Sequence, residues 1–101
     1  MSVVTAAITA EDTFTDWIKA KRPSDINDAN TFFLNISIAG TWVGTVTLQR
    51  RFSATDTPRD VETFTSNAEE ALYDHEEFSE YRIGIASGNY TSGTCNVRLG
   101  A

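Results

Sequence analysis

The chain has 101 residues, a length typical of one domain with one modest hydrophobic core. Its net charge of −6 argues against nucleic-acid binding, because proteins that bind nucleic acids normally present a basic surface. No apolar run approaches the roughly 18 residues of a membrane-spanning helix, so a membrane partner is also not expected.

Residues 1–10 carry no charge and are rich in Val, Thr and Ala. They lack the basic and long apolar regions of a secretion signal, which predicts a protein made in the cytoplasm. No segment nearby in the sequence offers them a pairing partner. We therefore expect an extended arm that adds to the sheet edge of a neighbouring subunit through Val3, Val4 and Ile8, with a disordered terminus as the alternative. Residues 11–101 are expected to form a single β-sandwich domain.

Residues 13–20 predict a short strand with a bulge or bend, because Phe14 and Trp17 do not share a face in strict alternation. The Pro-, Asp- and Asn-containing residues 21–30 predict a loop. Their Asp and Asn spacing lacks the glycine and glutamate that a calcium-binding EF-hand requires, so we expect a turn-rich loop there and no metal.

Residues 31–52 contain the longest β-strand pattern of the chain. From Phe32 to Ile38 every second residue is large and apolar, which is typical of a half-buried strand. A second alternating run places Val46 and Leu48 on one side and a threonine-rich face on the other. The Gly-containing residues 39–41 between the two runs predict a hairpin turn.

The rest of the chain continues in short β-patterns. Residues 60–65 predict a strand that returns against the second run, and residues 66–73 predict a further strand, with a helical turn as the alternative. Residues 80–86 and 94–99 predict strands that turn alternate side chains into the core, separated by a loop that Tyr90 tips. These inward side chains are Tyr81, Ile83, Ile85, Cys95, Val97 and Leu99. Seven to eight short strands predict an all-β, antiparallel β-sandwich or jelly roll.

The sequence offers little for catalysis. His75 is the single histidine, and it lies in an acidic loop predicted at residues 74–80. Because one histidine would have to activate every candidate nucleophile, we expect no enzyme, no metal and no cofactor. Cys95 predicts a small buried hydrophobic side chain. Trp42 and Tyr90 predict either stacking platforms for a sugar ring or anchors in the core or in an interface.

The pattern of strands and turns over residues 11–99 resembles small virion proteins of tailed bacteriophages. The likeness is carried by GTWVGTVTLQR at 40–50, DVETFT at 60–65, YRIG at 81–84, YTSGT at 90–94 and VRL at 97–99. Proteins of this kind are typically β-sandwiches or jelly rolls that are present in many copies.

The resemblance implies a non-enzymatic structural protein of the virion, assembled in the cytoplasm of the bacterial host. The implied role is capsid decoration (cement), with the major capsid protein or other virion proteins and copies of itself as partners. A neck, tail or fibre component and a carbohydrate- or receptor-binding module are the alternatives. The candidate interface residues are Val3, Val4, Ile8, Trp42, Arg50 and Tyr90.

Overall fold

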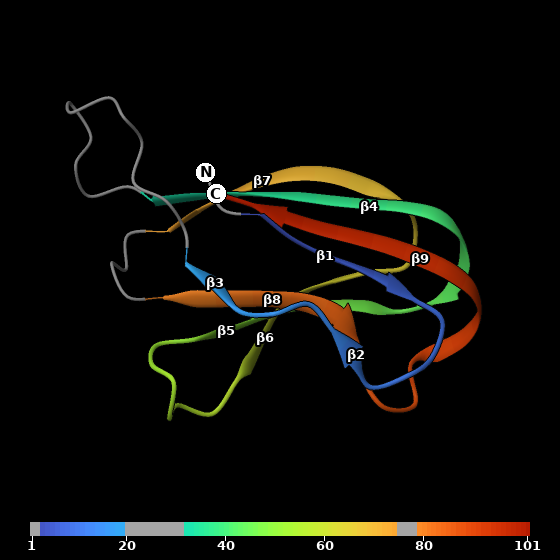
Figure 1. The fold of residues 1–101 in the computed structure, drawn as a ribbon, viewed down its shortest axis with the longest axis horizontal. Helices are drawn as coiled ribbons and strands as arrows, with labels where there is room; N and C mark the ends of the chain where they lie inside the picture. Colours follow the sequence, from blue (N-terminus) through green and yellow to red (C-terminus); the bar gives the residue numbers. More distant parts are fainter. Residues whose placement is uncertain (1–2, 20–31, 75–78) are drawn as a thin grey trace.

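The computed structural model describes residues 3–19, 32–74 and 79–101, and within these residues the chain forms nine β-strands and no helix. The strands are β1 (Val3–Ile8), β2 (Thr13–Phe14), β3 (Ile18–Lys19), β4 (Phe32–Gly44), β5 (Val46–Arg51), β6 (Arg59–Phe64), β7 (Ala68–Asp74), β8 (Glu80–Ile85) and β9 (Tyr90–Gly100). They lie in two sheets packed face to face (Figure 1). The first sheet, sheet A, has the order β1-β9-β4-β7. The second, sheet B, has the order β2-β8-β5-β6, and β3 also pairs with β8.

The strand pairs are nested in the manner of a jelly roll. The first strand pairs with the last (β1 with β9), and β2 and β3 pair with β8. Further inward, β4 pairs with β7 and β5 pairs with β6. All these pairs are antiparallel, and the β4–β9 and β5–β8 pairs join them into the two sheets. The predicted antiparallel sandwich of jelly-roll type is confirmed.

The hydrophobic core fills the space between the sheets. Alternate residues of β4, β8 and β9 turn inward, as the sequence pattern predicts. The buried apolar residues are Ile8, Ile18, Leu34, Ile36, Ile38, Val46, Leu48, Phe64, Tyr81, Ile83, Ile85, Cys95, Val97, Leu99 and Ala101. Burial raises the pKa of the Cys95 thiol to about 11, so Cys95 is a small core side chain and not a nucleophile at neutral pH.

The predicted hairpin at residues 39–41 is wrong. Strand β4 continues through Gly40, and β4 and β9 bend together at one end of the sandwich (Figure 1). Gly40 has φ +107°, and a Cβ at this position would lie 2.5 Å from the Thr94 carbonyl oxygen. The glycine therefore allows a bend with close backbone contact to β9, not a chain reversal. The chain enters sheet B only after Gly44.

The expectation that residues 1–10 form an arm outside the sandwich is also wrong. Residues Val3 to Ile8 form β1, which pairs in continuous register with β9 from Gly100 to Cys95. Ile8 is fully buried, and Val4 and Ala6 pack against the core. The pairing partner lies about 90 residues away in sequence, which is why no local pattern predicts it.

The bend predicted in residues 13–20 is confirmed, because β2 and β3 are separated by three residues that leave the ladder. Thr15 replaces the missing pairing with its own groups. Its N–H donates to the Ile83 carbonyl oxygen (2.9 Å), and its Oγ1 accepts the Ile83 N–H (3.2 Å). Next to it, β2 runs close beside Gly84, where any Cβ would collide with the backbone of Thr13 and Phe14.

The strand predicted at residues 66–73 is confirmed as β7. The predicted loop at 21–30 and His75 lie outside the described residues. Within the described part of the chain, no helix has the length and apolar character to cross a membrane. The same residues contain no group of three or more His, Cys, Asp or Glu side chains placed to hold a metal ion.

Two carboxylates face each other where the edge strands β6 and β7 meet at one side of the sandwich. Glu62 pairs with Leu48 and Glu70 pairs with Ile36, so both point to the core side of their sheets. Burial raises the pKa of Glu62, and the charge of Glu70 and a hydrogen bond with it raise the pKa further. The ionised form of Glu62 is therefore less favourable in the folded state than in the unfolded state.

We expect Glu62→Gln to stabilise the protein at pH 7. With a folded-state pKa above the unfolded value of 4.5, the contribution of Glu62 to stability is fully present below pH 4.5. It is lost as the pH rises through the folded-state pKa. The melting temperature of the variant should exceed that of the wild type at pH 7, and the difference should disappear below pH 4.5.

Asp56 provides a control, because its pKa is shifted in the opposite direction to that of Glu62. Hydrogen bonds, first of all from the Phe52 backbone, lower the pKa of Asp56 below its usual 3.8. Its contribution is therefore present above pH 3.8 and lost as the pH falls through the lower folded-state pKa. Asp56→Asn should lower the melting temperature at pH 7. A melting temperature for Glu62→Gln below that of the wild type at pH 7 would contradict the argument.

Candidate functional site

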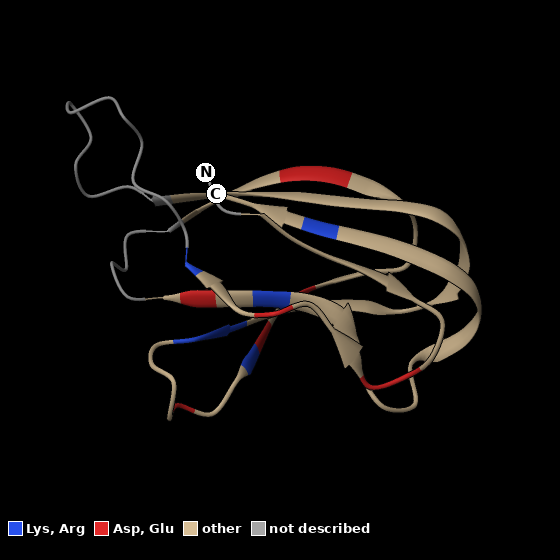
Figure 2. Cartoon of the chain, in the orientation of Figure 1, with Lys and Arg blue, Asp and Glu red and all other residues tan. Residues whose placement is uncertain are grey.

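Positive charge is concentrated on sheet B of this acidic protein (Figure 2). The cationic residues of this sheet are Lys19, Arg50, Arg51, Arg59 and Arg82, and Arg98 on β9 is the only other cation in the described residues. On β5 and β8, residues with buried side chains alternate with residues that point outward, and Arg51 and Arg82 lie at outward positions. The outer face of sheet B is therefore the candidate recognition surface.

Two aromatic rings and two guanidinium groups stack on this outer face. Arg51 Cζ lies 4.1 Å from the centroid of the Trp17 ring, and Arg82 Cζ lies 4.8 Å from it. Arg82 Cζ also lies 4.2 Å from the centroid of the Phe14 ring. We call these four residues the Arg–aromatic ladder. Each cation–π contact fixes a guanidinium in place, and the break between β2 and β3 brings Trp17 into contact with both arginines.

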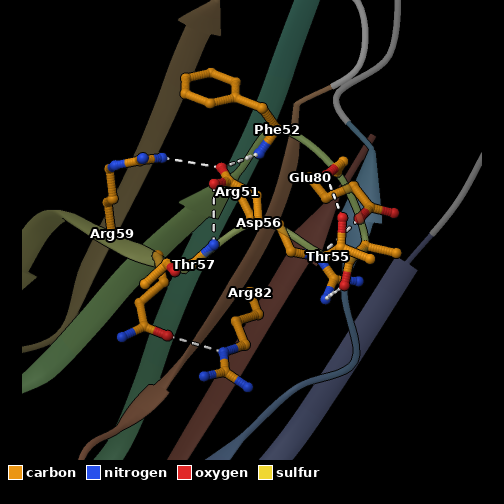
Figure 3. Close-up of polar contacts among 11 residues, drawn as sticks. Arg51, Phe52, Thr55, Asp56, Thr57, Arg59, Glu80 and Arg82 are labelled. Atoms are coloured by element: carbon orange, nitrogen blue, oxygen red, sulfur yellow. Dashed lines mark hydrogen bonds and ion pairs between the residues drawn. The ribbon is translucent and has the colours of Figure 1, made fainter.

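The two arginines of the ladder have different polar partners. Arg51 Nε donates to Glu80 Oε1 (2.8 Å), an ion pair in which both side chains are about one-fifth exposed. Arg82 Nε donates to the neutral Gln49 Oε1 (2.9 Å; Figure 3). No carboxylate of the described residues forms an ion pair with Arg82. Burial, followed by the nearby Arg51 charge, lowers the pKa of Arg82, and the negative charge of Asp12 offsets part of this shift.

The loop between β5 and β6 is held by one carboxylate beside the ladder. Asp56 accepts hydrogen bonds from the Phe52 N–H (3.0 Å), the Thr57 N–H (3.0 Å) and Arg59 Nη1 (2.9 Å; Figure 3). The Phe52 ring is flanked by the guanidinium groups of Arg50 (4.9 Å) and Arg59 (5.7 Å). The loop therefore presents a partly exposed aromatic ring at a fixed position.

An open cleft of about 440 Å³ lies between this loop and the strands β3 and β8. It is lined by Lys19, Phe52, Ser53, Ala54 and Glu80. The cleft adjoins the ladder at Glu80, which lines it and pairs with Arg51, and it adds an ammonium group and an apolar ring beside the guanidinium groups. Guanidinium groups bind carboxylates through paired hydrogen bonds, so this surface suits a partner that presents carboxylates beside apolar side chains.

The six residues predicted as interface candidates lie in different parts of the structure and do not form one surface. Three of them lie on β1: Val3 is 42% exposed, Val4 packs against the core and Ile8 is fully buried. Of these, Val3 is the one whose side chain is open to a partner. Arg50 lies on sheet B, where its guanidinium contacts the Phe52 ring.

Trp42 and Tyr90 lie near each other at the bend of β4 and β9, but neither ring is an exposed platform. Both side chains are partly buried and pack against the core. Trp42 Nε1 donates to Asn67 Oδ1 (2.8 Å), and the Tyr90 hydroxyl donates to the Gly93 carbonyl oxygen (2.8 Å). The prediction that Tyr90 tips a loop is wrong, because β9 begins at this residue. Both rings serve as structural anchors of the bend.

Sequence reasoning missed the Arg–aromatic ladder. Strand alternation places Arg51 and Arg82 on outer faces, which is a usable signal. The position of Trp17 has no such signal, because Trp17 lies in the interruption between β2 and β3, where strand pairing breaks.

No family model, curated protein or solved structure matches this chain. The structure shows the fold, an antiparallel jelly-roll sandwich, and a cationic and aromatic surface on sheet B that is a candidate for recognition. The particular function of this surface is inferred from its chemistry and from the sequence resemblance.

Proposed function

We propose that the protein is a non-enzymatic structural protein of a tailed-bacteriophage virion, a capsid decoration protein that binds the head lattice. The resemblance in strand and turn pattern supports the virion setting, and the jelly roll is a fold that many capsid components use. The observation that carries the proposal is Arg82 within the Arg–aromatic ladder of an acidic protein, since its guanidinium donates to the neutral Gln49 and forms no ion pair within the described residues. Such a group favours binding to a partner over catalysis.

In this proposal, carboxylates of the major capsid protein or another virion protein dock onto Arg82 and Arg51. Arg82 has N–H groups beyond Nε for a bidentate contact, and the Phe14 and Trp17 rings hold its plane. The neighbouring cleft receives an apolar side chain against Phe52. The net charge of −6 keeps unbound copies soluble, and the cationic sheet orients each copy toward an acidic lattice.

Arg82→Gln is the test of this proposal. We expect binding to purified heads, measured by co-sedimentation, to weaken about tenfold or more, because a charge-assisted contact is lost. Arg98→Gln is the matched control, since it removes the same charge from the other sheet. It should bind as the wild type does. Wild-type binding should also weaken with added salt.

Two other outcomes are informative. Binding to purified tails but not to heads would replace capsid decoration with a neck, tail or fibre role. Glycan-dependent binding that Trp42→Ala abolishes, without binding to heads or tails, would contradict the proposal and favour the carbohydrate- or receptor-binding alternative. Equal binding by the Arg82→Gln and wild-type proteins would show that the ladder is not the contact surface.

A further inference from the structure

The two sheets have four edge strands, and three of them carry features that oppose pairing with another chain. The β7 edge carries Glu69 and Glu70. The β6 edge carries Arg59, Asp60 and Glu62, and its register with β5 shifts at Leu48–Gln49. The remaining edge of sheet B is broken between β2 and β3. Charges, bulges and interruptions of this kind are the usual protection of sheet edges against association.

The fourth edge, β1, has no such protection. Its six residues, VVTAAI, include no charge and no proline, and its register with β9 is unbroken (Figure 2). In the described residues β1 pairs with β9 alone, so its other side has no strand beside it. A straight, neutral edge with free backbone groups is a template for one more strand.

The side chains of β1 also suit strand addition. Val4, Ala6 and Ile8 face the core, and the exposed residues Val3, Thr5 and Ala7 form the outer face. The outer side chains are small and uncharged, so a strand arriving at this edge meets no bulky or charged group on β1. The contrast with the other three edges indicates that β1 is the edge suited to pairing with another strand.

We propose that β1 pairs with β1 of a second copy of this chain, antiparallel about a two-fold axis. The two four-stranded sheets A then become one continuous sheet of eight strands. A second copy is the occupant that fits best, because a neutral strand of small residues is complementary to itself in the antiparallel direction and brings no like charges together. A two-fold contact of this kind closes on itself and gives a dimer.

The biological role of the β1–β1 dimer rests on the proposed function, since a decoration protein acts in many copies. Its existence is tested on the purified protein without heads, so either idea can fail alone. Head binding by a strictly monomeric protein would contradict the β1 contact only. A dimer that ignores heads and other virion parts would contradict the virion function only.

The test compares Ala7→Lys with Ala39→Lys by sedimentation equilibrium over a concentration series. Both alanines are exposed and pair with the same residue, Asn96, on the outer face of sheet A. Ala7 lies on the edge strand, and Ala39 lies on the interior strand β4. We expect the wild type and Ala39→Lys to dimerise equally. Ala7→Lys should dimerise about tenfold more weakly, because the two-fold axis then places two lysines of like charge on the pair of joined β1 strands. Added salt should screen this repulsion and restore part of the loss.

A wild type that stays monomeric at every concentration would overturn the contact, as would equal effects of the two lysines or no effect of either. If Ala7→Lys lowers the melting temperature, amide hydrogen exchange of the wild type decides. Protection of the β1 amides that rises with protein concentration supports the contact, and protection that does not change overturns it.

Discussion

Replacing Leu48 with alanine should lower the free energy of unfolding by about 2–5 kcal/mol, a large fraction of the roughly 5–15 kcal/mol typical of a domain. Leu48 is fully buried in β5, where it pairs with Ile83 of β8. The change removes apolar contacts and leaves a cavity between the sheets. Each kcal/mol should lower the melting temperature by roughly 4–8 °C for a chain of this size, which a thermal melt followed by circular dichroism can measure.

Two threonines on the other face of sheet B serve as controls. Thr63 is exposed, so Thr63→Ala should change stability by no more than about 0.5 kcal/mol. Thr47 is only 2% exposed, because it pairs with Gly84, beside which the Phe14 ring of β2 lies. Thr47→Ala should therefore have a measurable effect, but a smaller one than Leu48→Ala. A larger effect at Thr47 would mean that the main core lies on the other face of β5.

The inward faces of the strands could be predicted from the sequence because they follow from local alternation. Leu34 and Ile38 on β4, and Tyr81 and Ile85 on β8, all point inward as predicted. A period of two is set by the backbone of any extended strand, so it needs no knowledge of the partner strand. Fold class follows from the same local information.

Pairing between distant strands could not be predicted in this way. Gly40 is an example, because a glycine between two alternating runs marks a turn or a bend with equal strength. The distinction depends on Gly93, which pairs with Trp42 from the other strand and lets β4 and β9 approach closely at the bend. That partner lies more than 50 residues away in sequence.

The candidate site shows the same limit. The outward direction of Arg51 and Arg82 follows from alternation, but their common contact with Trp17 requires β3 and β5 to flank β8 in one sheet. The interrupted strand was predicted, and its consequence for the position of Trp17 was not. A candidate recognition surface assembled from separate strands becomes visible only when the strand order is known.

Removal of residues 1–10 should leave the protein largely unfolded at 25 °C. The truncated chain loses the whole of β1, including the fully buried Ile8, whose side chain alone contributes about 2–5 kcal/mol. It also exposes the edge of β9 and uncovers Cys95, Val97 and Leu99 on the core side. The summed loss approaches the total stability of a domain of this size. The measurement is the far-ultraviolet circular dichroism and thermal melt of a chain that begins at Glu11.

Single substitutions in β1 separate the core contribution from the rest. Ile8→Ala should lower the free energy of unfolding by about 2–5 kcal/mol, and Val3→Ala, at a 42% exposed position, should cost far less. A synthetic peptide with the sequence of residues 1–10, added in excess, should restore the folded signal of the truncated protein, because an extended strand can complete a sheet from outside the chain. A truncated protein that keeps the wild-type melting temperature would contradict the role of β1 as a strand of its own sandwich, and would return residues 1–10 to the status of an arm.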